Sequence, residues 1–346
     1  MKTKLFLALL AITLEVFGCK VAQTTPTTTA QSTTTPAPAT QCAANSLQSR
    51  MEEFAKVTAG PVGVAATLIE TGQTVTLNGD RHFTMQSVYK LPIAMAILTR
   101  VDKGSLTLAQ KVEIKPKDYV SRREHTIAID HPQGANLSVN ELLDYMVAES
   151  DGTACDALLR LLGGPEAATK YVRELKINDI TIATYEADMF ANPAVASENW
   201  STPLAMTEVL RLLQTGNVLS TNSRQLLLDL MTKSRPGPKR LKGLLPPEMQ
   251  VAHKTGTSGT INGVTAATND VGLINLPNGQ HLAIAVFVSA TKADLKTREE
   301  VIAKIARAAT DCWTASETQK TGAQSGGSCP VPSKNKVAIA TGRVLF

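Results

Sequence analysis

The order in which two hydrophobic patterns follow one another along the chain constrains its fold most. Apolar residues recur at helical spacing through a long middle stretch, from Ser87 to Met231. Apolar runs typical of strands stand on both sides of it, at 62–69, 74–77, 250–255, 265–276 and 281–289. Asn278-Gly279 supplies a hairpin turn between the last two runs. Strands at both ends predict one sheet built from the two chain termini, with the helical part inserted between them.

Two further segments are expected to cover this sheet. The spacing within 43–57 predicts a helix that Gly60-Pro61 ends, and 298–313 predicts an amphipathic helix that closes the body. The predicted fold class is α/β, of the α+β sandwich type, in which these helices flank an antiparallel sheet beside an inserted all-α domain. The sheet domain is assigned to residues 43–85 and 232–316, and the all-α domain to residues 86–231.

The N-terminus has the pattern of an export signal. Lys2 and Lys4 precede an apolar run, 5–14, that is too short to span a bilayer, which predicts a signal peptide over residues 1–18. The run ends in Val-Phe-Gly-Cys, which resembles a bacterial lipobox and makes Cys19 the candidate for lipidation. Ordinary secretion is the alternative, because a small residue before the cleavage site also suits an ordinary signal peptidase. Both alternatives predict an exported protein in the periplasm of a Gram-negative bacterium, and the first tethers it to a membrane through Cys19.

The segments that flank the body are expected to be flexible. Residues 19–42 are mostly Thr, Ala, Gln and Pro, with few large apolar side chains to offset the entropy of ordering them. Residues 317–346 are rich in Ser, Gly, Gln and Lys. A linker of the first kind would let a folded body stand clear of the membrane.

Composition and motif content exclude several functions. The formal charge is 35 − 30 = +5, aromatic residues make up only 4%, and the basic residues are scattered, which argues against a nucleic-acid partner. Five Cys without a CxxC pair and five His without HExxH give no local metal-ligand spacing. The dinucleotide and P-loop fingerprints are missing. We therefore expect no metal, no cofactor, and chemistry carried by side chains.

One candidate for that chemistry is Ser87-Val88-Tyr89-Lys90, which places a hydroxyl and an amine on one face of a helix. The pattern recurs at Ser289/Lys292 and at Ser333/Lys336. Only Ser87 opens a long apolar helix, 91–98, whose burial would favour the neutral, proton-accepting form of Lys90. A simple helix-capping serine is the alternative interpretation.

Two further motifs stand near expected element boundaries. Ser150-Asp151-Gly152 lies between two predicted helices, and Lys254-Thr255-Gly256-Thr257 ends a predicted strand. The Lys-Thr-Gly triplet recurs at 320–322, within the polar tail, where we expect no function. At Lys254 the strand predicts an open sheet edge along which a substrate could lie against backbone N–H groups.

The ordered set of these motifs, together with Glu186, resembles the class A serine β-lactamases over about residues 43–313. Asn199-Trp200-Ser201-Thr202-Pro203 and the segment 265–270 resemble the PER-like and VEB-like extended-spectrum subclass. The resemblance implies a serine β-lactamase/D,D-peptidase-like fold and a hydrolase that acts on cyclic amides. It also implies a loop near 184–203 that carries the catalytic glutamate, a small β-lactam as partner, and a monomer.

The resemblance implies a role for each catalytic residue. Ser87 is the nucleophile, and Lys90 is a nearby base. Ser150 passes a proton to the departing lactam nitrogen, and Lys254 sets the electrostatics of Ser150. Glu186 activates the water that attacks the acyl-enzyme, and the family leaves open whether it or Lys90 is the base for acylation.

The substrate-binding residues are implied in the same way. The hydroxyls of Thr255 and Thr257 would hold the substrate carboxylate beside Gly256, and the backbone N–H of Thr257 would join that of Ser87 in the oxyanion hole. Arg240 resembles the subclass's second cation for that carboxylate, and a solvated surface charge is the alternative.

The sequence departs from the family at two positions. Gly152 stands where the family has an Asn that hydrogen-bonds the substrate's acylamino group. Phe190 stands where the family has a water-positioning Asn, and a phenyl ring cannot hold water. Two alternatives stay open. One is a D,D-peptidase or penicillin-binding protein, which shares the SxxK and Lys-Thr-Gly motifs but usually lacks the Glu186 loop, and the other is a lipoprotein that binds β-lactams and deacylates slowly, which Phe190 keeps open.

The cysteines within and after the body give two further expectations. Cys155 lies in an apolar helical pattern and is expected to be a buried free thiol. Among Cys42, Cys312 and Cys329, a Cys42–Cys312 disulfide is favoured if the first and last helices pack antiparallel on the sheet.

Overall fold

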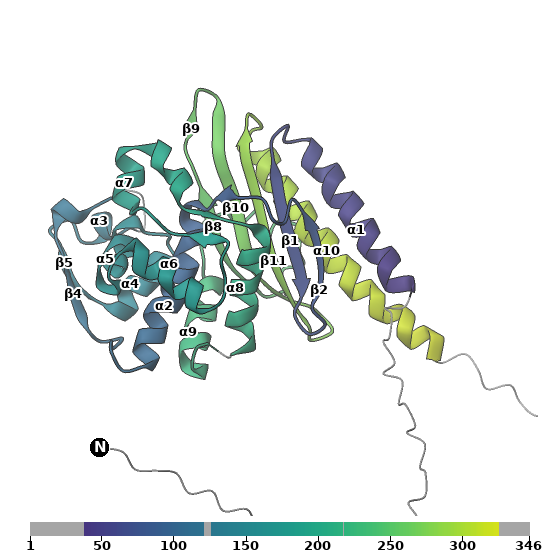
Figure 1. Ribbon diagram of the computed structural model, residues 1–346, viewed down its shortest axis with the longest axis horizontal. Coiled ribbons are helices and arrows are strands. Elements are labelled where there is room, and N and C mark those ends of the chain that lie inside the picture. The colour runs from purple at the N-terminus through teal and green to yellow at the C-terminus, as the bar shows by residue number, and fades with distance from the viewer. Residues whose placement is uncertain (1–37, 121–125, 217, 325–346) are drawn as a thin grey trace, which may run out of the picture. The chain divides into compact units, whose positions relative to one another are not determined.

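The computed structural model describes residues 38–120, 126–216 and 218–324, and side chains from 45 to 314 within them. A sheet formed by strands from both ends of the chain is its centre (Figure 1). The strand order is β2 (Gln73–Leu77), β1 (Val62–Leu68), β11 (His281–Thr291), β10 (Val264–Asn275) and β8 (Val251–Thr257), and β9 (Thr260–Ile261) pairs with β10. All these pairs are antiparallel, and Val62 of β1 lies opposite Val288 of β11. The predicted antiparallel sheet and fold class are confirmed.

Helices cover both faces of this sheet. On one face, α1 (Pro38–Lys56) packs beside α10 (Leu295–Gln324), and Met51, Val64, Val286 and Ile302 share a buried core there. On the other face, Phe287 and Val271 join the core of the helical part. Because β11 is covered on both faces, it is an almost continuous run of buried apolar residues instead of an alternating one.

The helical part is organised around α2 (Lys90–Asp102). Its residues 90–98 are all buried, so neighbouring helices contact it from every side. The other helices are α3 (Ile127–Asp130), α4 (Val139–Val147), α5 (Gly152–Leu162), α6 (Pro165–Glu174), α7 (Glu186–Ala191), α8 (Pro203–Thr215) and α9 (Thr221–Thr232). A capping box of Ser138 and Glu141 begins α4, and Gly163, in the left-handed region at φ 104°, ends α5.

Short elements that the sequence analysis missed connect these helices. Two small antiparallel sheets are formed by β4 (Lys111–Ile114) with β5 (Ala135–Ser138), and by β3 (Phe83–Thr84), β7 (Trp200–Ser201) and β6 (Ile180–Thr181). Three 3₁₀ turns are η1 (Gln86–Tyr89), η2 (Pro116–Asp118) and η3 (Pro193–Glu198). Strands of two to four residues are too short to show alternation, which is why the middle of the chain was predicted to be entirely helical.

The last helix also differs from its predicted length. α10 continues to Gln324, past the expected end at Trp313 and into the segment expected to be a flexible tail. The added residues include Ala, Glu, Gln and Lys, which favour helix, and extending an existing helix needs no new nucleus.

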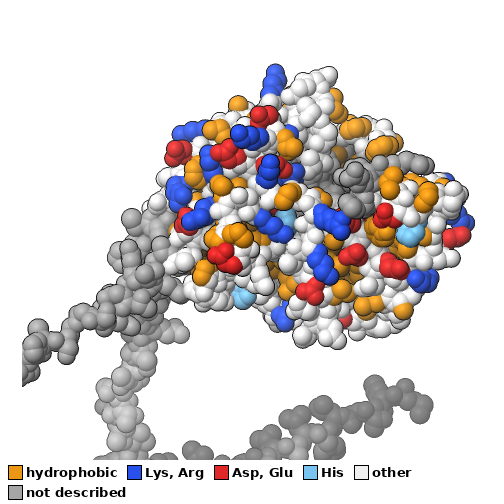
Figure 2. All heavy atoms as spheres, turned by 180° about the vertical axis from the view of Figure 1, so that it is seen from behind, with side chains coloured by type: hydrophobic (Ala, Val, Ile, Leu, Met, Phe, Trp, Pro, Cys, Tyr) orange, Lys and Arg blue, Asp and Glu red, His pale blue; other side chains and the backbone are white. Residues whose placement is uncertain are grey.

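The remaining predictions about the termini lie outside the described residues. These are the signal peptide, the lipidated Cys19, the linker up to residue 37, Cys329 and the Ser333/Lys336 pair; the side chain of Cys42 is also outside them. Within the described ranges, no helix combines the length and the apolar character needed to cross a bilayer. The face in Figure 2 carries side chains of both charges interspersed with apolar and neutral ones.

Candidate active site

Ser87 lies in the 3₁₀ turn η1, directly before the buried helix α2. Gln86 has a positive φ of 48°, and the Asn269 side chain donates to the carbonyl oxygens of Thr84 and Met85 at 2.8 and 3.1 Å, which fixes the turn against β10. The Lys90 Nζ donates to Ser87 Oγ at 2.7 Å. Ser87 is inside η1 and not at a cap position, so the helix-capping interpretation is wrong.

Lys90 connects three parts of the site. Its Nζ is buried and lies 2.6 Å from Glu186 Oε1, and it also donates to the Ser150 carbonyl oxygen at 3.1 Å. A buried ammonium group is tolerated only when it is paired and hydrogen-bonded, and Lys90 meets both conditions.

Ser150 occupies the turn between α4 and α5 with a φ of 63°, in the left-handed region. This conformation directs its carbonyl oxygen to Lys90, while its hydroxyl accepts a hydrogen bond from Lys254 Nζ at 2.9 Å. The adjacent Asp151 holds the turn, because its carboxylate accepts from the N–H groups of Ala154 at 2.7 Å and Ile127 at 3.0 Å. Ser150 therefore lies between two lysines.

Lys254 extends from β8 into the same site and is fully buried. Burial first, and then the charge of Lys90, hold the pKa of Lys254 well below its usual range. Two residues along β8, a Cβ on Gly256 would overlap the Met85 carbonyl oxygen, so only glycine lets the strand approach η1.

Arg240 lies behind the end of β8, in the loop after α9. It is 4% exposed, so the surface-charge interpretation is wrong. Its guanidinium donates to the Asn269 carbonyl oxygen at 2.9 Å and to Thr257 Oγ1 at 2.8 Å, and it pairs with Glu299 at 3.3 Å. Arg240 thus touches one of the two threonines predicted to bind the substrate.

Glu186 is the first residue of α7, and its main chain is held by a carboxylate. Asp156 of α5 accepts from the N–H groups of Glu186 at 2.7 Å and Ala187 at 3.0 Å. Burial raises the pKa of Glu186, but the charge and hydrogen bond of Lys90 and a hydrogen bond from Tyr89 outweigh it, so the net pKa is lowered. Glu186 is accordingly ionised in the resting site.

These residues meet at a cleft of about 800 Å³. Its lining residues include Ser87, Ser150, Gly152, Glu186, Thr255 and Thr257. A Cβ on Gly152 would stand 3.1 Å from Val120 and 3.3 Å from the Glu186 Cβ, so a larger residue there would crowd the glutamate. Phe190, 70% exposed at the rim, presents a phenyl ring to the cleft.

All of the predicted catalytic and substrate-binding residues of the body thus lie at or directly behind one cleft, and the Ser289/Lys292 copy of the SxxK motif is not among the residues that line it. Ser289 lies on β11, and its buried Oγ has no hydrogen-bond partner among the described residues. The described part of the chain holds no cluster of three or more His, Cys, Asp or Glu side chains suited to a metal ion. Cys155 is a buried free thiol on α5, as predicted, whereas the disulfide of Cys42 stays a prediction.

The sequence analysis missed three residues that shape the site: Asp156, Tyr89 and Asn199. Asp156 carries a usable signal, because an acid in an apolar helical pattern needs a buried partner. Asn199 Oδ1 accepts from the N–H groups of Ala183 at 2.7 Å and Thr184 at 3.1 Å and so ties down the loop that precedes Glu186. Nothing in the sequence alone predicts that contact.

Comparisons with known proteins find one family along most of the chain. The model of the β-lactamase enzyme family matches residues 46–313. β-Lactamase VEB-1 of Pseudomonas aeruginosa is 40% identical over 267 residues, which cover 76% of this chain and 89% of that protein. Extended-spectrum β-lactamase PER-1 of the same organism is 40% identical over 250 residues, 72% of this chain and 81% of that protein.

Solved structures of similar sequence share the fold. A β-lactamase from Chitinophaga pinensis superposes with a TM-score of 0.76 at 43% identity, covering 78% of this chain and all of that one (100%). The TLA-3 extended-spectrum β-lactamase superposes with a TM-score of 0.75 at 38% identity, covering 78% of this chain and 98% of that one.

Proposed function

The chain belongs to the class A serine β-lactamases, and on that premise we propose how its own residues open a β-lactam. As a member of this family it hydrolyses β-lactam antibiotics and so gives resistance to them. The observation that carries the residue assignments is the meeting of two lysine–serine pairs at one cleft: Lys90 with Ser87 at 2.7 Å, and Lys254 with Ser150 at 2.9 Å.

Acylation begins with attack of Ser87 Oγ on the lactam carbonyl carbon. Lys90 contacts Ser87, and in its neutral, proton-accepting form it takes the Ser87 proton, while Glu186 keeps its charge beside it. The N–H groups of Ser87 and Thr257 stabilise the oxyanion. When the carbon–nitrogen bond breaks, Ser150 gives its proton to the nitrogen, and Lys90, which lies beside Ser150, replaces it with the proton taken from Ser87. Lys254 holds the Ser150 hydroxyl during this transfer.

In deacylation, a water molecule attacks the ester that joins Ser87 to the opened lactam. Glu186, which stays ionised through acylation, takes a proton from a water molecule, and the water oxygen attacks the ester carbonyl carbon. The ester bond to Ser87 breaks, Glu186 passes the proton from water through Lys90 to Ser87 Oγ, and the opened product leaves. Phe190 offers this water no hydrogen bond, so the position of the water depends on Glu186 and on the substrate.

The substrate carboxylate is bound by the threonines of β8. Arg240 donates to Thr257 Oγ1, so the hydrogen of that hydroxyl is free to point outward to an anion. Thr255 and Thr257 line the cleft, and Arg240 and Lys254 behind them add positive potential. Gly152 gives the acylamino group no side-chain amide.

These contacts support hydrolysis over the two alternatives. Glu186 is held at the cleft, a feature that a D,D-peptidase usually lacks, and the similar proteins are β-lactamases. A slow-deacylating binding protein would need no ionised base beside Ser87. We further propose that the enzyme is a monomer exported to the periplasm and tethered by lipid at Cys19, on the evidence of the N-terminal sequence.

Replacing Ser87 with alanine tests the assignment. Ser87→Ala should abolish both turnover of a chromogenic cephalosporin and covalent labelling by penicillin, measured by intact mass. Ser289→Ala removes the serine of another SxxK copy and should leave both signals unchanged. Labelling that persists in Ser87→Ala would refute the proposed nucleophile.

A further inference from the structure

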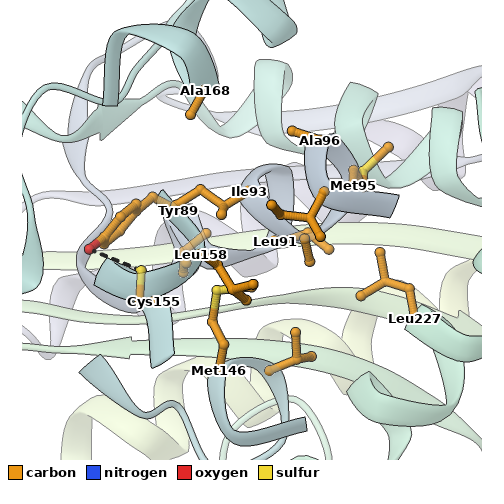
Figure 3. Packing of buried hydrophobic residues seen from close by; sticks show 14 of the residues in the cluster. Tyr89, Leu91, Ile93, Met95, Ala96, Met146, Cys155, Leu158, Ala168 and Leu227 are labelled. Carbon is orange, nitrogen blue, oxygen red and sulfur yellow. Dashed lines mark hydrogen bonds between the residues drawn. The ribbon is translucent and has the colours of Figure 1, made fainter. Parts of the chain in front are cut away.

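Tyr89 stands between the proposed nucleophile and its lysine and has no part in the steps above. Its side chain is fully buried among helical-core residues such as Ile93 and Leu158 (Figure 3). Its hydroxyl donates to Glu186 Oε1 at 3.1 Å and accepts from Cys155 Sγ at 3.5 Å. A buried tyrosine hydroxyl that reaches the proposed base from the core side needs an explanation.

The two oxygens of Glu186 have different surroundings. Oε1 is contacted by Lys90 Nζ at 2.6 Å and by the Tyr89 hydroxyl at 3.1 Å. Oε2 has no such donor among the described residues. Asp156 fixes the main chain of Glu186, so holding Oε1 as well restricts how the carboxylate can turn.

We propose that Tyr89 is a positioning residue for deacylation: its hydroxyl holds Oε1 of Glu186, and Oε2 is thereby the oxygen that takes the proton from the attacking water. This inference rests on the proposed function. Because Glu186 lines the cleft, the oxygen that is not held on the core side is the one available to water.

Lys90 alone cannot hold Oε1 throughout the cycle. Its Nζ also bonds Ser87 and the Ser150 carbonyl oxygen, and its charge changes as it exchanges protons with its neighbours. Tyr89 keeps its proton, because burial and nearby acidic groups raise its pKa well above the usual range. Its hydroxyl therefore donates to Oε1 at every stage.

The groups that face Glu186 determine whether removing the Tyr89 hydroxyl raises or lowers the pKa of Glu186. Lys90 from α2, Lys254 from β8 and the Tyr89 hydroxyl from η1 favour the ionised carboxylate, whereas burial and the Asp156 carboxylate of α5 disfavour it. Cys155, the other group on α5, touches Glu186 only through Tyr89. Removing the hydroxyl should raise the pKa of Glu186, so the base loses its charge at a higher pH.

Tyr89→Phe tests the proposal, because it removes the hydroxyl and keeps the ring. Acylation and deacylation by a penicillin are measured separately by rapid quench and intact mass between about pH 4 and 8. The acid limb of the deacylation rate should move up by about one pH unit, so that rate falls by up to roughly tenfold at pH values on the acid side of the wild-type limb and changes little near pH 7. Acylation should change less.

Tyr171→Phe is the matched control. It removes the hydroxyl of a half-buried tyrosine, which bonds Thr99 Oγ1 at 3.1 Å toward the C-terminal end of α2, and it should leave the acid limb in place. Melting temperatures of all variants separate positioning from packing. An unshifted acid limb in Tyr89→Phe, or a loss of rate equal at every pH, would overturn the inference alone. A wild-type enzyme that fails to deacylate would overturn the proposed function with it.

Discussion

At the scale of single residues, the site depends on keeping Glu186 charged in a buried place. Burial acts against this charge, and Lys90 and Tyr89 act for it. The amide of Glu186→Gln cannot take a proton from water, so acylation should survive while deacylation slows by about 10² to 10⁴-fold. Intact-mass measurement at steady state should then find a long-lived adduct on the variant and little on the wild type.

A control and a second variant complete this test. Glu198→Gln alters an exposed acid of the same loop and should behave as wild type. If the wild type itself accumulates adduct, Phe190 limits the water site, and Phe190→Asn should speed release. Unchanged turnover in Glu186→Gln would rule out the proposed base.

The titration of Asp156 makes the stability of the folded chain depend on pH. Burial, only partly offset by the N–H groups of Ala187 and Glu186, raises its pKa from 3.8 to about 6. The folded chain then binds this proton more tightly than the unfolded chain does, so the contribution to stability is full below about pH 4 and is lost as pH rises through about 6.

Thermal unfolding checks the sign of this term. Between about pH 4 and pH 7 the melting temperature of the Asp156→Asn variant should fall less than that of wild type, because the amide does not titrate. Asp144→Asn changes an exposed acid of α4 and should follow wild type. Parallel curves for Asp156→Asn and wild type would exclude this contribution of Asp156.

At the scale of elements, the sequence predicts those whose pattern repeats. β10, β11, α4 and α5 are long enough to show strand or helix periodicity, and all were predicted. β3, β6 and β7 have two residues each, and they form only through pairing with one another. No local sequence pattern predicts such pairing. Their pairing brings Trp200 beside Thr84, close before Ser87, and so links the loop near Glu186 to the nucleophile's turn.

The residues of the site likewise fall into those that local sequence predicts and those that it does not. Ser87, Lys90, Ser150 and Lys254 carry chemistry within motifs, so spacing and order identified them. Tyr89 has the same local pattern as an apolar core residue, and only its contact with a glutamate 97 residues away gives its hydroxyl a role. Local sequence predicts which groups are reactive, whereas the groups that orient them depend on tertiary contacts.

At the scale of the whole molecule, the proposed site is built from the described body alone. Every contact described for the proposed site lies between residues 83 and 299, far along the chain from Cys19. Cys19→Ala should therefore move the protein from the membrane fraction to the soluble periplasm, with kcat within about twofold of wild type because the described contacts of the site lie far along the chain from Cys19. Ultracentrifugation and a chromogenic assay check this, with Cys155→Ala as a cysteine control that stays membrane-bound. An unmodified mature N-terminus other than Cys19 would refute lipidation.

The pairing of β1 with β11 also sets the order of events during synthesis. Val62 pairs with Val288, so β1 and β11 cannot pair until more than two hundred further residues have been synthesised. Contacts of such long range fold slowly, because a large loop must be closed before they form. Lys254 and Asn269 likewise reach Ser87's surroundings only after the chain is nearly complete. A chain that ends before Lys254 therefore lacks part of the site, and the site is complete only once the last strands have joined the first.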